Sequence, residues 1–261
     1  MSKPALFFIH GMWSTPAVWD DLVSHFEARG HECHAPALPF HERDREQGDP
    51  DPMLATIGVE DYVDALIASA RDVPRPIVII GHSMGAMLAQ KLAEAIKPEG
   101  LILLSPAPTA ATQRLSVDPL RTTFGVTKNV RGKWWKSPTL IDKDRARWGI
   151  FNEVPGDVTE KEIDALVWDS GRVLYQISMP WADRTNATKV DYSALDMPAM
   201  VVVGEADRIT PVATARATAR ALSGETDYHE YPGVGHWLFH DAAREQLVGD
   251  IEAFLSRNDI R

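Results

Sequence analysis

The chain repeats one pattern along most of its length: a short, continuous apolar run followed by a segment with helical spacing of its apolar residues. Six such runs lie at 5–11, 32–38, 76–80, 100–108, 198–207 and 226–233, and those at 32–38 and 226–233 also contain polar residues. Unbroken apolar strands are typical of parallel sheets that are buried on both faces. Their alternation with helices predicts an α/β fold with a mostly parallel central sheet covered by helices on both faces.

The segments between these runs carry helix signals. Residues 14–30 offer Ser14 or Thr15 as an N-cap, Pro16 in the first turn and Gly30 as a C-terminal stop. We predict further helices at 58–70, 84–96, 210–222 and 242–255.

Residues 109–190 break the pattern and hold five of the eight tryptophans. We therefore predict a core domain of residues 1–108 and 191–261, with residues 109–190 inserted as a helical cap over one edge of the sheet. We call this insertion the cap segment. Its residues 110–147 carry nine basic and three acidic side chains. A solvated surface is the simpler interpretation, and attraction of a carboxylate-bearing substrate is the alternative.

Composition limits the partners and the location. The net charge of −10 disfavours nucleic acid and anionic membrane surfaces as general partners. No stretch approaches the roughly 18 apolar residues that a membrane-spanning helix needs. The apolar run before His10 is too short for a secretory signal, so we expect a cytoplasmic protein. The single Cys33 excludes an internal disulfide.

The sequence GHSMG places Ser83 where a buried strand must turn into a helix. A turn this sharp forces its corner residue into a strained backbone conformation, and Gly81 and Gly85 allow the chain to bend that tightly. The strain exposes the serine side chain and leaves the first amides of the helix, which carry partial positive charge, facing whatever the serine attacks. We therefore predict Ser83 as a nucleophile.

A serine hydroxyl needs a base that is held by a third group. Active sites of open α/β sheets form beyond the carboxyl ends of the strands. His236 follows the last predicted strand, and Asp207 follows the one before it. We predict these as the base and the acid, because the order serine, acid, histidine is the one expected for this arrangement. Glu205, two residues before Asp207, is the alternative acid.

The sequence HGMW directly follows the first strand, and we call residues 10–13 the oxyanion loop. We expect the chain to turn at Gly11 and to present the Met12 amide to an oxyanion, with the Met84 amide as the second donor. His10 is expected to hydrogen-bond within the loop, and His82 to pack under the serine.

Metal binding finds little support. His240 lies four residues after His236, a spacing that suits two metal ligands on a helix. No HExxH pattern or third ligand accompanies the pair, so we predict no metal site. Seven tryptophans are candidates for lining a substrate pocket: Trp13, Trp134, Trp135, Trp148, Trp168, Trp181 and Trp237.

Together, HGMW, GHSMG, GEADRITP and GVGHW resemble the oxyanion loop, nucleophile, acid and histidine motifs of the α/β-hydrolase superfamily, over nearly all of the chain. One departure is Ala86, where close relatives often carry a third glycine. The resemblance implies a serine hydrolase without metal or cofactor, and a serine rather than aspartate at Ser83 argues against dehalogenases and epoxide hydrolases.

The expected reaction is hydrolysis of a small, moderately hydrophobic carboxylic ester through an acyl-enzyme. Three alternatives remain open. The same triad supports lactone opening, carbon–carbon bond hydrolysis, perhydrolysis and acyl transfer. The fold also serves as a non-catalytic small-molecule receptor, and hydroxynitrile lyases share the arrangement.

Overall fold

A computed structural model, which describes residues 3–114 and 133–260, contains one six-stranded sheet in the order β2-β1-β3-β4-β7-β8. The strands are β1 (Ala5–Ile9), β2 (Cys33–His34), β3 (Ile77–His82), β4 (Gly100–Leu104), β7 (Ala199–Gly204) and β8 (Thr226–Tyr231). Every neighbouring pair is parallel. The structure therefore confirms the predicted α/β fold with a parallel central sheet.

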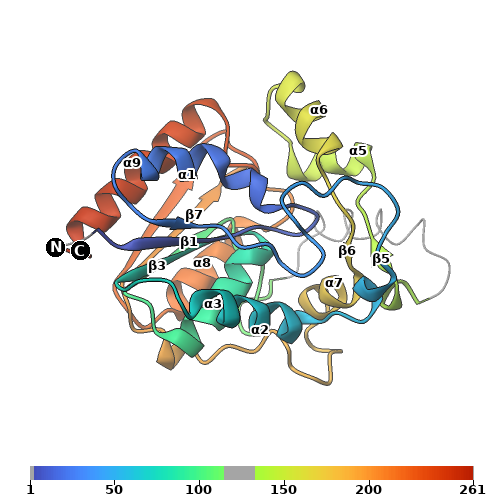
Figure 1. Cartoon of the computed structure of the whole chain (residues 1–261), viewed down its shortest axis with the longest axis horizontal. Helices are drawn as coiled ribbons and strands as arrows, with labels where there is room; N and C mark the ends of the chain where they lie inside the picture. Colours follow the sequence, from blue (N-terminus) through green and yellow to red (C-terminus); the bar gives the residue numbers. More distant parts are fainter. Residues whose placement is uncertain (1–2, 115–132, 261) are drawn as a thin grey trace.

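Helices cover both faces of the sheet (Figure 1). One face carries α1 (Asp20–Glu27) and α9 (Asp241–Arg257), and the other carries α2 (Val59–Ala70), α3 (Met84–Ile96) and α8 (Val212–Ala221). Successive strand residues point to opposite faces, so Phe7 packs in one hydrophobic cluster and Phe8 in the other. Burial of both faces explains why the strands are continuous apolar runs.

The elements from η3 to α7, which follow β4 in the chain, lie beyond one end of the sheet, opposite the end where both chain termini lie (Figure 1). They comprise η3 (Trp134–Lys136), β5 (Pro138–Thr139), α5 (Lys143–Arg145), the π-helical turn η4 (Ala146–Ile150), α6 (Gly156–Asp164), β6 (Asp169–Ser170) and α7 (Gly171–Ser178). β5 and β6 pair antiparallel. About half of the basic stretch 110–147 lies outside the described residues.

Some predicted elements are shorter than expected. The predicted helix 14–30 begins as a 3-10 turn, η1 (Pro16–Trp19), before α1, and the predicted strand 32–38 contributes two residues to the sheet edge as β2. Pro36 lacks an amide hydrogen for a strand ladder, which limits that strand. Two further 3-10 turns are η2 (Pro52–Ala55) and η5 (Tyr192–Ala194).

The strand order reverses between β1 and β3, because the chain runs from β1 outward to β2 and then crosses to β3. In open α/β sheets, ligands bind at such a switch point, beyond the carboxyl ends of the strands. The oxyanion loop follows β1 and Ser83 follows β3, so both predicted motifs leave the sheet there. Across residues 3–114 and 133–260, no helix has the length and apolar character to cross a membrane.

Helix α3 packs so closely on β1 and β3 that side chains are excluded at two positions. A Cβ atom at Gly85 would overlap the main-chain carbonyl of Ile9, and one at Gly81 would overlap the main chain of Gly85. Both clashes are with backbone, which cannot move aside as a flexible side chain can.

Gly85→Ala is therefore expected to lower the free energy of unfolding by at least the roughly 1–3 kcal/mol typical of overpacking. The matched control is Gly249→Ala in helix α9, where nothing lies within 4 Å of the added Cβ. Helix propensity should raise the stability of that variant by about 0.5–1 kcal/mol. Urea denaturation measures both, and equal midpoints for Gly85→Ala and the wild type would contradict the close packing.

Candidate active site

Ser83 stands at the corner between β3 and α3 in a backbone conformation that side chains rarely adopt, with φ 56° and ψ −120°. Such a conformation costs about 1–3 kcal/mol and persists only where the surrounding structure fixes it. The Ser83 amide donates to the Leu104 carbonyl (2.9 Å), and the Ser83 carbonyl accepts from the Ala107 amide (2.9 Å). The strand end and the loop after β4 therefore hold the strained residue in place.

The oxyanion loop lies directly against this corner. A Cβ atom at Gly11 would sit 3.2 Å from the Cβ of Ser83, so the loop backbone comes close to the predicted nucleophile. Met84 is the first residue of α3, where the helix leaves its amides without intrahelical partners. Within the part of the chain that the structure describes, neither the Met12 nor the Met84 amide donates a hydrogen bond. Their role as oxyanion donors stays a prediction.

Asp207 and His236 form a buried pair. His236 Nδ1 lies 2.8 Å from Asp207 Oδ2, and the two residues are 2% and 8% exposed, respectively. The other carboxylate oxygen accepts hydrogen bonds from the Ile209 and Thr210 amides, both at 2.8 Å. The Thr210 hydroxyl lies 2.8 Å from Oδ2. The pair has the geometry that orients a histidine base.

The charge of Asp207 follows from these contacts. Burial raises the pKa of this carboxyl group, but the neighbouring His236 and the hydrogen bonds from His236 and Thr210 outweigh burial and hold the pKa below its usual value. Asp207 is therefore ionised at neutral pH and can stabilise an imidazolium at His236.

His82 packs against His236. Its Nε2–H donates to the main-chain carbonyl of His236 at 3.0 Å, and the two rings lie 4.8 Å apart. Burial lowers the pKa of His82 to about 3, so its ring is neutral. His82 is buried beside His236 and lines the same cavity as Ser83, and its packing under the serine stays a prediction.

Ser83 and His236 line one small cavity of about 30 Å³, together with Met12, Trp13, Leu166 and Trp237. A second, larger cleft of about 230 Å³ lies next to it, between η1–α1 and helix α6. Ser14, Leu166 and Trp237 line both. The two spaces therefore share walls, while Ser83 and His236 line only the smaller one.

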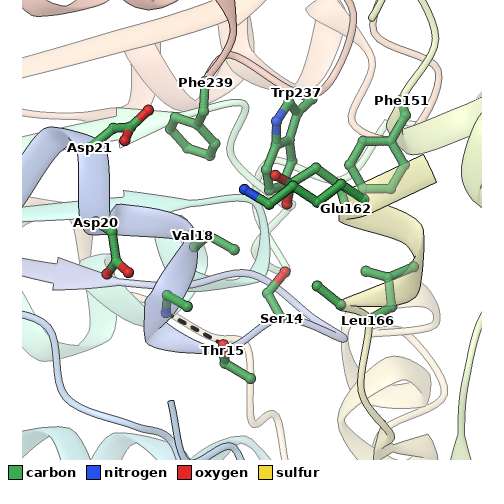
Figure 2. A pocket seen from close by; sticks show the side chains of 13 residues that line it. Ser14, Thr15, Val18, Asp20, Asp21, Phe151, Glu162, Leu166, Trp237 and Phe239 are labelled. Atoms are coloured by element: carbon green, nitrogen blue, oxygen red, sulfur yellow. Dashed lines mark hydrogen bonds between the residues drawn. The ribbon is translucent and has the colours of Figure 1, made fainter. Parts of the chain in front are cut away.

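Figure 2 shows how this cleft is built. The rings of Phe239, Trp237 and Phe151 form one wall, and Val18, Ser14 and Leu166 face them. Glu162 of α6 lies at the cleft, and burial raises the pKa of its carboxyl group. The cleft walls are mixed, because Asp20, Asp21 and Lys161 line the cleft together with these apolar side chains.

The seven candidate tryptophans occupy different surroundings. Trp13 and Trp237 line the cavity at Ser83. The five in the cap segment pack as follows: Trp134 edge-on against Trp135, Trp148 under the Arg208 guanidinium, Trp168 with its indole N–H on the Gly48 carbonyl, and Trp181 at 66% exposure. Substrate binding by the cap tryptophans stays a prediction.

The alternative candidates lie apart from this arrangement. Glu205 is exposed, and its amide donates to the Tyr231 carbonyl. His240 lies 3.8 Å from its neighbour Asp241. Among the described residues, no three histidine, cysteine or acidic side chains gather as metal ligands would.

Sequence reasoning missed two residues that support the pair. The Thr210 hydroxyl bonds Asp207, and a threonine three residues after a candidate acid could have signalled this. Asn152 of the cap segment donates to the Ala206 carbonyl at 2.8 Å, just before Asp207. No local pattern around Asn152 indicates that contact, because the two residues are far apart in the sequence.

Comparison with known proteins identifies a family whose model matches most of the chain. The family model described as "Alpha/beta hydrolase family" matches residues 6–250. The bifunctional biotin biosynthesis protein BioHC of Cellvibrio japonicus is 23% identical over 97% of the chain, and lipase LipV of Mycobacterium tuberculosis is 27% identical over 69%. The chain matches 48% of the length of the first relative and 64% of the second.

Two solved structures illustrate the shared fold. A methylesterase from Arabidopsis superposes with a TM-score of 0.70 at 14% identity, covering 97% of this chain and 99% of the other. A pyrethroid hydrolase from Sphingobium faniae superposes with a TM-score of 0.72 at 19% identity, covering 97% of each chain.

Asp207→Asn is expected to leave the protein folded and to lower kcat for ester hydrolysis by several orders of magnitude, because the amide favours the wrong histidine tautomer. The matched control is Glu205→Gln, the same chemical change two residues away on an exposed side chain. Initial rates with a p-nitrophenyl ester compare the two. A larger loss for Glu205→Gln would mean that the acid is wrongly assigned.

Proposed function

The chain belongs to the alpha/beta hydrolase family, and on that premise we propose that it hydrolyses carboxylic esters through Ser83, His236 and Asp207. One observation carries the proposal. Ser83, strained at the strand-to-helix corner, and His236, bonded to a buried Asp207, line the same cavity at the switch point of the sheet. A strained serine in one cavity with a histidine that an acid orients supports nucleophilic acyl transfer as the reaction.

In the proposed acylation step, the Ser83 hydroxyl attacks the ester carbonyl and His236 Nε2 takes its proton. The ionised Asp207 stabilises the imidazolium and keeps Nδ1 protonated. The tetrahedral intermediate then collapses, and His236 returns the proton to the leaving alcohol. Water, deprotonated by His236, attacks the acyl-enzyme and releases the acid, so one water is consumed for each ester cleaved.

The oxyanion that forms in both steps needs donors that are already in place. The Met12 and Met84 amides are proposed for this role, because both flank Ser83 and neither donates a hydrogen bond within the described residues. The partial positive charge at the start of α3 adds to the effect. Loss of one such donor typically costs about 3–4 kcal/mol of barrier.

The cleft beside the cavity supports small, moderately hydrophobic esters as the substrate class. The rings of Phe151, Trp237 and Phe239 form one of its walls, so an ester arm that lies against them gains about 0.8 kcal/mol for each well-buried methylene. The other walls also carry polar and charged side chains, which limits the apolar length that fits. Relatives described as a lipase, a methylesterase and a pyrethroid hydrolase fit this class.

Ser83→Ala is expected to abolish ester turnover and labelling by a fluorophosphonate probe, while the circular dichroism spectrum and melting temperature stay close to wild type. A small side chain replaces another at the corner, so folding is not disturbed. The wild type should be labelled at one site. A wild type that binds small esters without labelling or turnover would instead favour a non-catalytic receptor.

Leu166→Ala is expected to change which ester chain length is preferred, because Leu166 lines both the cavity and the cleft. The measurement is kcat/KM across acetyl to decanoyl p-nitrophenyl esters. Ile163→Ala is the matched control, since this isoleucine is also buried at α6 but contacts neither space. Parallel profiles for both variants and the wild type would place the ester arm elsewhere.

A further inference from the structure

Asp169 is a carboxylate with no exposed surface, and it lies outside the proposed triad. Three hydrogen-bond donors and the His41 ring surround it. Oδ1 accepts from the Tyr62 hydroxyl (2.7 Å) and the Ser170 amide (2.6 Å), while Oδ2 accepts from the Trp13 amide (3.0 Å) and forms an ion pair with His41 Nε2 (3.3 Å). Burying a carboxylate is costly unless it is paired and hydrogen-bonded, so these contacts offset the cost of burying Asp169.

The cluster joins the cap segment to the oxyanion loop. The Trp13 amide donates to Asp169, and the Trp13 carbonyl accepts from the Val167 amide at 2.9 Å. Residues 167–169 therefore hold Trp13 by both of its main-chain polar groups. Trp13 needs such a restraint, because its φ of 60° lies in the left-handed region that a bulky side chain rarely adopts.

The core domain supplies the other partners of Asp169. Tyr62 comes from α2, and His41 comes from the loop after β2, where its Nδ1–H donates to the Pro39 carbonyl at 2.8 Å. Burial lowers the pKa of His41, but Asp169 and the Pro39 carbonyl outweigh burial and raise it overall. Burial raises the pKa of Asp169, but His41, Tyr62 and the Trp13 amide outweigh burial, so the pKa of Asp169 is lowered overall. Both shifts in pKa favour the charged forms of the two side chains.

We propose that Asp169 is a positioning residue, which acts through the Trp13 amide to hold the oxyanion loop so that the adjacent Met12 amide faces the reacting carbonyl. This role rests on the proposed ester hydrolase function. Asp169 touches no substrate, and its effect is confined to the steps in which an oxyanion is present.

The chemistry of the cluster makes Asp169 hard to replace. Two of its three hydrogen-bond donors, the Trp13 and Ser170 amides, are backbone groups that cannot reverse, and each oxygen receives one of them. In Asp169→Asn, the new NH₂ group therefore meets a main-chain N–H whichever way the amide turns. In Asp169→Ala, both acceptors are lost, and the restraint on Trp13 from this side chain disappears.

Asp169→Asn and Asp169→Ala are expected to lower kcat for a p-nitrophenyl ester, by about tenfold and about a hundredfold, respectively. Outright loss of an oxyanion donor costs roughly 10²–10³ in kcat, which sets the upper limit. KM should stay within about twofold, because the ground-state ester makes no oxyanion. The pH at which activity falls to half on the acid side should not move, since the Asp207–His236 pair is untouched.

A pair of inhibitors separates positioning from general damage to the site. A trifluoromethyl ketone adds the Ser83 hydroxyl to its carbonyl and leaves an oxyanion in the adduct, with the proton on His236. The matching secondary alcohol binds without any oxyanion. The Asp169 variants should bind the ketone more weakly, by the same factor as kcat falls. They should bind the alcohol as tightly as the wild type does.

Asp183→Asn and Asp183→Ala are the matched controls. Asp183 is another buried aspartate of the cap segment, but its carboxylate bonds Thr185 and the Ala187 amide within its own loop. These variants should keep wild-type kcat and ketone affinity, even where thermal melting shows a similar loss of stability. If Asp169→Ala does not fold, Asp169→Asn decides the question. Tyr62→Phe, which removes one donor from Oδ1, is a milder third variant, and we expect a smaller loss of kcat for it.

The proposal is overturned by Asp169 variants that fold and keep wild-type kcat, by a rise in KM alone, or by equal weakening of the ketone and the alcohol. Failure of the ester hydrolase function itself looks different, because the wild type would then neither turn over the ester nor react with a fluorophosphonate. That result would overturn the role of Asp169 as well.

Discussion

Close contact between strand β1 and the first turn of helix α3 determines the geometry of the candidate site. The Ile9 carbonyl lies where a side chain at Gly85 would be, so the helix can approach the strand only because that residue has none. The approach brings the oxyanion loop, which continues β1, against Ser83. A strained corner on β3 and a loop on β1 become one site because the sheet order reverses between these two strands.

Hydrogen bonds to main-chain carbonyls join the cap segment to the loops on two sides of this site. Asn152 bonds the Ala206 carbonyl beside Asp207, Arg208 bonds the Trp148 carbonyl, and Val167 bonds the Trp13 carbonyl. The segment therefore lines part of the cleft in Figure 2 and also bonds the loops that carry the proposed acid and oxyanion donors. Changes in the cap segment are expected to affect chemistry as well as substrate preference for this reason.

Much of the core could be predicted from the sequence because its signals are local. A strand buried on both faces is a continuous apolar run, and β1, β3, β4 and β7 all have this pattern. Edge strand β2 was predicted too long, since its pairing depends on a neighbour and ends before Pro36. Elements of the cap segment are short and irregular, so periodicity could indicate their presence but not their bounds.

By itself, the sequence determined the corner at Ser83 and the order of serine, acid and histidine, because turn chemistry and strand ends are encoded within a few residues. Tertiary structure alone decided how the site is held. The Trp13 amide meets the Asp169 carboxylate across 156 residues, and Tyr62 meets it across 107. A contact between residues so far apart leaves no periodic or local pattern in the chain, so only the packing of the cap segment against the core creates it.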